Sequence, residues 1–451
     1  MSEANISGDI DWNAIDAEVI GYLRDILRLD TRNPPGNEMR AAAYLRSVLE
    51  KEGFECVIVG PSPDRATLVT RLKGDGSEPP LLLMSHTDVV AVEPEKWSYH
   101  PFSGEIANGY VYGRGALDMK NMVTMELMTM LLLKRMGVPL KRDVIYMAEA
   151  DEETGGEQGA KWIVEHHPEL IQAAYALNEG GGDGLKINDQ LYYTVETAEK
   201  GTARFRIRTT GNPGHGSIPH KNNAIVRLAA LLSKDNQPPV HFTDTLRGYI
   251  EGIASAQAPE IAAAFKKVLI DENGASEAID QLPIDESLKN ELHAMSRNTI
   301  APTMLKAGSQ INVIPSEAEV YVDGRTLPGQ ALEQYLEELH TIFGNDCEIE
   351  FINPARALES DPNSPLFEVI KEVIHTHEPK ATIIPTMLTG GTDAKHVSHL
   401  GTMVYGFSPT LYIDENGWGG VHGHDERINM RAMQWGTRIL YEVVEKFARR
   451  D

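Results

Sequence analysis

Histidine and carboxylate side chains collect at one kind of position in this sequence, directly after short apolar segments. Three segments end in this way: Leu81–Ser85 before His86-Thr87-Asp88, Asp143–Ala150 before Asp151-Glu152-Glu153, and Ala173–Leu177 before Asn178-Glu179. Such apolar runs indicate buried β-strands, and open α/β proteins place their ligands at the carboxyl ends of parallel strands. We therefore expect one histidine and several carboxylates to meet at one edge of a sheet.

Two further polar residues stand at comparable places. Asp118 lies in a glycine-rich segment before a long helical pattern, and His422 lies shortly before the last helical pattern. Carboxylates that cluster away from water repel one another, and a divalent cation removes that cost. Imidazole and carboxylate ligands suit zinc, cobalt or manganese, and more ligands than one zinc ion needs indicate a two-metal centre. The patterns alone leave structural roles open: a packed His86, an N-capping Asp118 and a surface His422.

Eight segments carry a resemblance to a known family, in order and over nearly the whole chain: Leu83–Val90, Tyr112–Lys120, Asp151–Gly156, Leu177–Gly180, Gly214–Ser217, Asp323–Gly329, Gly390–Lys395 and His422–Glu426. Together they closely resemble the co-catalytic zinc exopeptidase family. That family includes aminoacylase, carnosine dipeptidase, glutamate carboxypeptidase, acetylornithine deacetylase and succinyl-diaminopimelate desuccinylase. Two positions depart from it: Asn178 stands where many relatives have Asp, and Lys395 stands where Arg is frequent, which alters the recognition of a substrate carboxylate.

The resemblance implies five ligands for two divalent metal ions. His86 with Glu179 would hold one ion, His422 with Glu153 would hold the other, and Asp118 would bridge the two. Zn²⁺ is the expected ion, with Co²⁺ or Mn²⁺ as alternatives.

The resemblance also implies roles in catalysis and substrate binding. Glu152 would be the general base that activates a metal-bound water. Asp88 would accept the other ring N–H of His86 and fix its tautomer. His215 would stabilise the tetrahedral oxyanion. Three residues would contact the substrate, namely Arg325 as a bidentate clamp for a carboxylate, Asn312 as a polar contact, and Ser408 at the border of the pocket.

The elements that must position these residues begin with an α/β pattern. Helical spacing covers Ile15–Leu29, Met39–Glu52, residues 119–135, Pro365–Thr376 and residues 429–447. Strand-like runs cover Thr67–Leu72, Leu81–Met84, Asp143–Ala148, Ala173–Leu177 and Thr402–Gly406. Strands separated by helices predict a parallel sheet covered by helices.

A different order of elements fills the middle of the chain. The strands Thr202–Thr209, Glu317–Asp323 and Glu348–Phe351 and the helices Asn223–Ser233 and Leu332–Phe343 give a ferredoxin-like α+β order. Together with the resemblance, this order implies the fold class α/β, a zinc-exopeptidase-like, helix-covered mixed sheet with an inserted ferredoxin-like lid. The metal-binding domain would comprise residues 1–196 and 354–451. The lid, which would also serve dimerisation, would comprise 197–353, with an extra helical stretch at about 236–300 whose place is not predicted.

Composition sets limits on partners and location. The 451 residues, at roughly 150 per domain, suggest two or three domains. A net charge of −24 disfavours nucleic acid and anionic membranes as partners. Cys56 and Cys347 are too few for a thiolate zinc cluster, and they indicate either a reducing compartment or a protein indifferent to redox state. Met1–Trp12 does not resemble a signal peptide, and Met122–Leu133 is too short to span a bilayer, so we expect a cytoplasmic protein.

The leading hypothesis is a metal-dependent amidohydrolase. It would cleave a dipeptide, a peptide C-terminus or an N-acyl amino acid, and it would form a homodimer through the lid. The alternative is a non-catalytic member of the same fold that binds a metal or a ligand. A serine hydrolase is disfavoured because no GxSxG elbow is apparent, and a dinucleotide site because Gly113 and Gly115 lack the third glycine.

Overall fold

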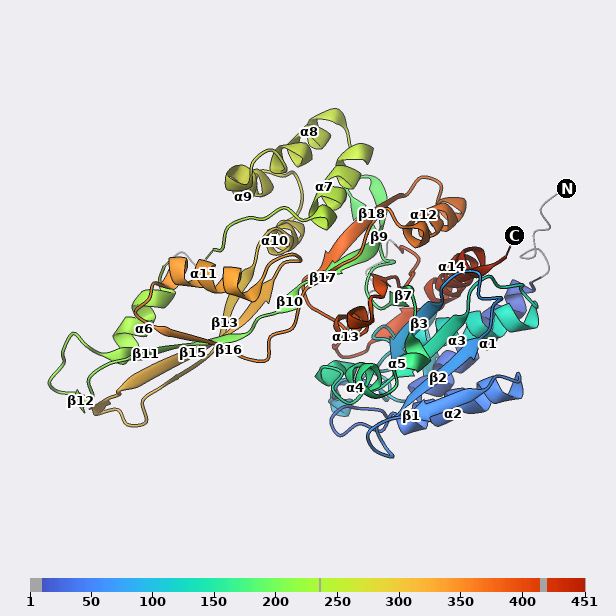
Figure 1. Ribbon diagram of the computed structural model, residues 1–451, viewed down its shortest axis with the longest axis horizontal. Coiled ribbons are helices and arrows are strands. Elements are labelled where there is room, and N and C mark those ends of the chain that lie inside the picture. The colour runs from blue at the N-terminus through green and yellow to red at the C-terminus, as the bar shows by residue number, and fades with distance from the viewer. Residues whose placement is uncertain (1–9, 235–236, 414–419, 451) are drawn as a thin grey trace. The chain divides into compact units, whose positions relative to one another are not determined.

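The computed structural model describes residues 10–234, 237–413 and 420–450 (Figure 1). It divides into two compact units, and each is described by itself. The first unit contains Met1–Glu196, Ser360–Ile383 and Thr392–Asp451, and the second contains Thr197–Glu359 and Ile384–Gly391. The domain boundaries at 196/197 and 353/354 stay a prediction. Residues 1–9, which belong to the segment that we expect not to be a signal peptide, lie outside the described residues.

A mixed sheet forms the base of the first unit, and residues 197–199, 358–359 and 384–388 of its last strands belong to the second unit. The strands run in the order β1 (Cys56–Val59), β2 (Thr67–Leu72), β6 (Val144–Glu149), β3 (Leu81–His86), β7 (Tyr175–Asn178), β19 (Met403–Gly406), β9 (Gln190–Glu199) and β17 (Leu358–Glu359), and β8 (Gly184–Ile187) and β18 (Thr382–Leu388) also pair with β9. Strands β6, β3, β7 and β19 are mutually parallel. Strands β1, β2 and β9 are antiparallel to their neighbours, so the predicted mixed sheet is confirmed. The short connection between β1 and β2 permits only antiparallel pairing.

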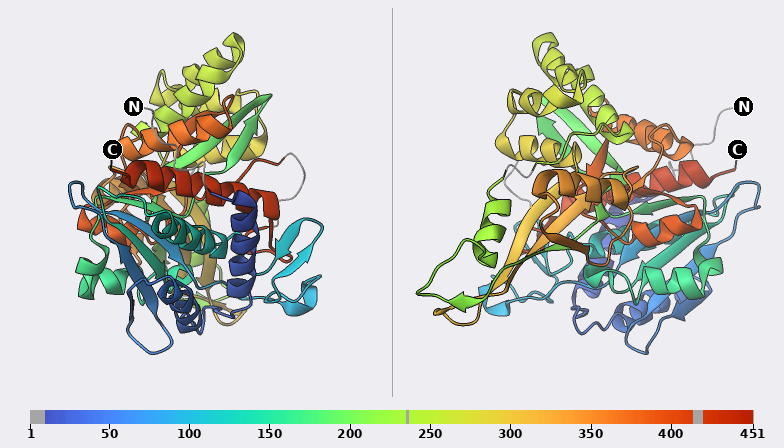
Figure 2. Two further views of the ribbon diagram at one scale, coloured as in Figure 1. Left: turned by 90° about the vertical axis from the view of Figure 1, so that its right-hand side faces the viewer. Right: turned by 60° about the vertical axis from the view of Figure 1, so that its left-hand side comes forward.

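Helices lie against both faces of this sheet (Figures 1 and 2). They are α1 (Trp12–Leu27), α2 (Met39–Lys51), α3 (Lys120–Arg135), α4 (Ala160–His166), α5 (Pro168–Ile171), α12 (Pro365–His377), α13 (Ala394–Val397) and α14 (Met430–Ala448). Every residue of α3 from Lys120 to Leu133 is buried, including the charged side chains of Lys120 and Glu126. Leu81 and Leu83 of β3 join the same core cluster as α1 and α3.

Short elements complete the first unit. Strands β4 (Glu105–Ala107), β5 (Tyr110–Tyr112) and β20 (Arg427–Asn429) form a small antiparallel sheet. Three turns of 3₁₀-helix lie at Pro94–Lys96, Glu152–Thr154 and Ser398–Leu400.

The second unit contains a five-stranded antiparallel sheet. Its strands run β13 (Thr299–Ala307), β15 (Glu317–Thr326), β11 (Phe205–Thr210) and β16 (Glu348–Phe351), with β10 (Gly201–Thr202) also on β15. Helices α6 (Ala224–Leu232) and α11 (Leu332–Phe343) bury apolar residues against one face, in a cluster around Phe205 and Tyr335. The chain order strand, helix, two strands, helix, strand is ferredoxin-like. A short ribbon joins β12 (Gly214–His215) to β14 (Val313–Ile314).

The stretch at about 236–300, whose place the sequence leaves open, contains four helices. These are α7 (Asp244–Ala256), α8 (Pro259–Val268), α9 (Glu272–Asp280) and α10 (Glu286–Met295). Thr243, Asp271 and Asp285 accept backbone N–H groups at three of the N-termini, as N-caps do. Across the described parts of the chain, no helix combines the length and apolar character that crossing a bilayer requires.

Candidate metal centre

The carboxyl ends of β3, β6 and β7 lie side by side at one edge of the first unit's sheet. The parallel register pairs His86 with Glu149 and Leu83 with Leu177. All residues of β3 and β6 are buried, so each strand is an unbroken apolar run until its polar end. The prediction that these strand ends meet at one edge is confirmed.

Asp118 lies between two imidazoles at this edge. Its Oδ1 is 3.0 Å from Nε2 of His86, and its Oδ2 is 3.1 Å from Nε2 of His422. One carboxylate therefore presents a different oxygen to each ring. This is the arrangement that a bridging ligand between two cations requires.

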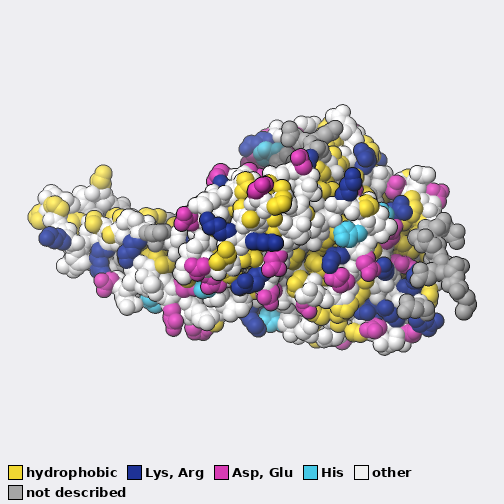
Figure 3. Space-filling model, turned by 90° about the horizontal axis from the view of Figure 1, so that it is seen from above, with side chains coloured by type: hydrophobic (Ala, Val, Ile, Leu, Met, Phe, Trp, Pro, Cys, Tyr) yellow, Lys and Arg dark blue, Asp and Glu magenta, His cyan; other side chains and the backbone are white. Residues whose placement is uncertain are grey.

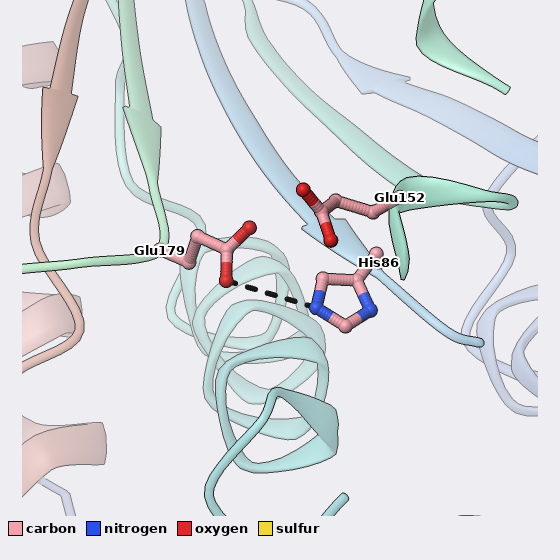
Figure 4. Close-up of side chains that lie close together, drawn as sticks. All are labelled: His86, Glu152 and Glu179. Atoms are coloured by element: carbon pink, nitrogen blue, oxygen red, sulfur yellow. Dashed lines mark ion pairs between the residues drawn. The ribbon is translucent and has the colours of Figure 1, made fainter. Parts of the chain in front are cut away.

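Two glutamates complete the cluster, one on each side. Glu179 Oε2 lies 3.7 Å from His86 Nε2, and Glu153 Oε2 lies 3.2 Å from His422 Nε2. His86, Glu152 and Glu179 offer ligand atoms that lie within 4.8 Å of one another (Figure 4). The structure thus brings the five predicted ligands and the predicted base together, whereas their roles stay a prediction.

The chemistry of this donor set fits divalent cations. Within residues 10–234, 237–413 and 420–450, Asp118, Glu152, Glu153 and Glu179 pair with no lysine or arginine. Oε1 of Glu153 is buried and has no hydrogen-bond partner. Burial, with the charge of Asp118, raises the pKa of Glu153 to about 7, and burial with the charge of Glu179 raises the pKa of Glu152 well above its usual value. A divalent cation would relieve this repulsion, and two imidazoles with carboxylates are ligands that zinc prefers.

Asp88 holds both the first histidine and the loop of the two glutamates. Its Oδ1 accepts the N–H of Glu152 at 3.1 Å, and its Oδ2 accepts the N–H of Glu153 at 3.2 Å. Nδ1 of His86 lies 3.0 Å from the backbone oxygen of Asp88 and 3.5 Å from its Oδ1. The nearest acceptor for the ring N–H is therefore the carbonyl, since the carboxylate is occupied by the glutamate loop. Either contact fixes the tautomer that leaves Nε2 free for a cation.

A buried hydrogen-bond network holds Asp88 in place, and it was not predicted from the sequence. Asn33 Nδ2 donates to Asp88 Oδ2 and to Asp151 Oδ1, each at 2.9 Å. Arg65 donates to Asn33 Oδ1 at 3.0 Å and forms a buried ion pair with Asp151. Asp151 has a φ of 75°, so it adopts a left-handed conformation directly before Glu152. Asn33 and Arg65 lie far from every motif in the sequence, so no local signal indicates them.

His215 and two of the predicted substrate contacts, Asn312 and Arg325, belong to the second unit. Ser217 Oγ lies 2.8 Å from Nδ1 of His215, and the N–H of Gly216 donates to the backbone oxygen of Asn312 at 2.7 Å, so His215 and Asn312 share the β12–β14 ribbon. Arg325 donates to both oxygens of Asp323, at 2.7 and 3.3 Å. Its guanidinium therefore already holds a carboxylate of its own strand. The substrate roles stay predictions.

Ser408, the remaining predicted contact, lies in the first unit. It follows β19, and its N–H donates to the backbone oxygens of Gly180 and Gly181 at 3.1 and 3.3 Å. Ser408 is thus next to the segment that begins with Glu179. His424, in the same motif as His422, faces Glu93 at 3.7 Å instead.

Comparisons with known proteins match this chain over most of its length. The sequence pattern of peptidase family M20/M25/M40 matches residues 82–446. The N-fatty-acyl-amino acid synthase/hydrolase PM20D1 of Mus musculus is 28% identical over 385 residues, which are 82% of this chain and 75% of that protein. Aminoacylase-1 of Sus scrofa is 27% identical over 441 residues, 95% of each chain. The structure of Sso-CP2, an M20 family metallo-carboxypeptidase from Sulfolobus solfataricus, shares the fold with a TM-score of 0.69 and 20% identity, over 95% of this chain and 99% of that one.

Proposed function

Because the chain belongs to peptidase family M20/M25/M40, we propose that the side chains around Asp118 form its two-metal centre. The chain is a metal-dependent hydrolase of an amide bond in a dipeptide, at a peptide C-terminus or in an N-acyl amino acid. The first cation site would consist of His86 and Glu179, and the second of His422 and Glu153. Asp118 would join both sites, since its two oxygens face the two imidazoles, and this observation carries the proposal.

The ions proposed for the two sites are Zn²⁺, with Co²⁺ or Mn²⁺ as alternatives. Such ions, when bound, supply Lewis acidity that polarises a carbonyl and lowers the pKa of water. Glu152 supplies the base: it takes the proton of the attacking water and passes it to the leaving nitrogen. Its backbone is fixed by Asp88, and its side chain points toward His86 and Glu179 (Figure 4).

N-acyl amino acids are the proposed first choice of substrate. By name, PM20D1 and aminoacylase-1 both act on acylated amino acids, and each matches most of this chain. His215 is proposed to stabilise the oxyanion, Arg325 to bind the substrate carboxylate, and Asn312 and Ser408 to contact its polar groups. For Arg325 this role requires that the substrate replace Asp323 on the guanidinium.

A homodimer through the second unit is proposed because that unit exposes an edge strand and apolar side chains. Strand β13 is an edge strand, and its Met304 and Leu305 are 55% and 62% exposed. Ile218 and Val226 are exposed as well, and hydrophobic side chains gather at the end of this unit on the left of Figure 3. A second copy could pair with the edge strand and cover these side chains.

A location in the cytoplasm is proposed from the two cysteines, which are both free thiols. The strong negative charge favours small substrates over nucleic acid or anionic membranes.

The substitution Glu152→Gln tests the proposed function. It removes the proton acceptor but none of the predicted ligands, so kcat on the best N-acyl amino acid should fall by about 10²- to 10⁴-fold. Metal content, measured by inductively coupled plasma mass spectrometry, should stay at the wild-type value. The matched control is Glu157→Gln, an exposed glutamate that pairs with Lys161.

Two results would count against this account. A Glu152→Gln chain with the wild-type rate would contradict the role of the base. A metal-loaded wild-type chain that hydrolyses no dipeptide, peptide or N-acyl amino acid would favour the non-catalytic alternative.

A further inference from the structure

Arg114 and Glu426 form a buried ion pair behind the segments that carry Asp118 and His422. The two side chains are 2% and 0% exposed, and Arg114 Nη1 donates to Glu426 Oε2. The guanidinium also lies over the ring of Trp97, 5.3 Å from its centroid. Charges held this far from water depend on each other for stability.

The carboxylate of Glu426 binds the loop that leads to Asp118. Its Oε2 accepts the N–H of Gly115 at 3.1 Å. Its Oε1 accepts the N–H groups of Leu117 and Asp118 at 2.8 and 3.2 Å. A side chain that lies 308 residues further along the chain therefore fixes the backbone of the proposed bridging ligand.

The guanidinium of Arg114 binds the loop of His422. Its Nη2 donates to the backbone oxygens of His422 and Gly423, at 3.2 and 3.0 Å. His422 has a φ of 61°, a conformation that is uncommon for a residue with a side chain. Arg114 holds the carbonyls of two consecutive peptide groups, those of His422 and Gly423. It therefore stabilises the backbone that presents the imidazole.

Apart from the shared Asp118, the ligands of the first cation site do not depend on this pair for their backbone. His86 ends β3 and Glu179 follows β7, and both strands have neighbours on two sides. His422, in contrast, is carried by a loop that is tied down by Arg114, by the pairing of Arg427 with Tyr112, and by hydrogen bonds from Ser98 to Asp425.

We propose that Arg114 and Glu426 are positioning residues that lock the Asp118 and His422 segments together and so set the affinity of the second cation site. This inference rests on the two-metal centre of the proposed function. Loss of the pair should loosen the second site more than the first. Replacing groups that orient metal ligands weakens metal binding by about 10- to 100-fold, and we expect an effect of that size.

Cobalt titration of the full chain tests this proposal. The metal-free wild type and Glu426→Gln are titrated with Co²⁺ and followed by calorimetry and by the visible absorption of bound cobalt. Glutamine keeps the size of the side chain, but its one acceptor oxygen cannot serve both pairs of donors. The wild type should bind two ions, and Glu426→Gln should bind one of them about 10- to 100-fold more weakly, with the other within a few-fold of wild type.

Two further variants make the result decisive. Arg114→Lys keeps the charge, but its single nitrogen cannot replace both Nη1 at Glu426 and Nη2 at the two carbonyls. It should therefore show the same selective loss, and it serves if Glu426→Gln does not fold. The control is Asp143→Asn at the amino end of β6. Like Glu426, the Asp143 carboxylate accepts hydrogen bonds from an arginine and from the backbone: from Arg71 at 2.9 Å and from the N–H of Gly74 at 2.8 Å. The Asp143→Asn variant should leave the cobalt affinity of both sites unchanged.

Three outcomes overturn the proposal. Wild-type affinity at both sites in a folded Arg114→Lys or Glu426→Gln chain would overturn it alone. An equal loss at both sites would overturn it too, because that indicates a general structural role. A wild-type chain that binds no cobalt would overturn the proposed function and this inference with it.

Discussion

The two units of the chain both gather carboxylates, but the carboxylates have different partners. On the sheet of the second unit, Arg206 contacts Glu319 at 2.8 Å and also pairs with Glu350, and Arg208 lies 3.4 and 3.5 Å from Glu317 and Glu348. At the edge of the first unit's sheet, Glu153 and Glu179 face two histidines, with Asp118 between them.

The difference follows from where each set lies in its sheet. In the second unit, the antiparallel register sets Arg206 opposite Glu350 and Arg208 opposite Glu348, so each charge meets its opposite across the strands. In the first unit, parallel strands end together, and Glu152, Glu153 and Glu179, which follow them, meet without a lysine or arginine partner among the described residues. The same residue types therefore stabilise one surface and prepare the other to bind an ion. The partner, rather than the composition, distinguishes the two.

Removal of the Asp118 carboxylate should have the largest effect on metal binding and activity. Asp118→Ala takes away the group that faces both imidazoles, so both cation sites should weaken and kcat/KM should fall by at least about 1,000-fold, several kcal/mol of stabilisation. Steady-state kinetics with metal analysis measures both effects. Normal metal content and turnover in this variant would show that the cluster is structural.

Glu38 differs from the carboxylates around Asp118, because it is a buried carboxylate of the first unit with an arginine nearby. Arg65 Nε lies 3.5 Å from its Oε2, yet burial raises its pKa to about 7. A raised carboxyl pKa favours folding below the unfolded pKa, near 4.5, and that contribution is lost as the pH rises through about 7.

The free energy of unfolding should therefore decrease by up to about 3 kcal/mol from pH 4.5 to pH 7.5 on account of Glu38. Calorimetry of wild type and Glu38→Gln across this range measures it, with the exposed Glu368→Gln as control. The variant should show a smaller loss of stability with pH. Parallel profiles for the two chains would contradict this reading of Glu38.

The charged face of the second unit should give the smallest effect. Arg206→Gln removes two ion pairs that face solvent, and such pairs contribute about 0–1 kcal/mol each. We expect a small, salt-dependent decrease in the melting temperature and an unchanged kcat/KM. A decrease in activity that persists in a stable chain would show that this face is not purely structural.

Much of this arrangement could be predicted from the sequence. The strands β2 and β16 and the helix α11 begin and end where the sequence predicts, because their apolar spacing is regular. The ends of β3, β6 and β7 were found because strands that are buried on both faces read as unbroken apolar runs.

Other parts of the structure leave no local signal. Strand β13 has exposed apolar residues, a proline at 302 and a shift in register after it, so it lacks the alternation of a half-buried strand. Asn33 and Arg65 act through contacts with Asp151, which lies far along the chain. Sequence patterns indicate which residues are polar and where elements end, but they do not show which distant partner a polar group meets.

Anomalous X-ray diffraction from crystals grown with zinc tests the central claim most directly. The account predicts two peaks per chain in the first unit, one beside His86 and one beside His422, with the carboxylate of Asp118 between them. A single peak, or peaks that lie away from Asp118, would contradict it.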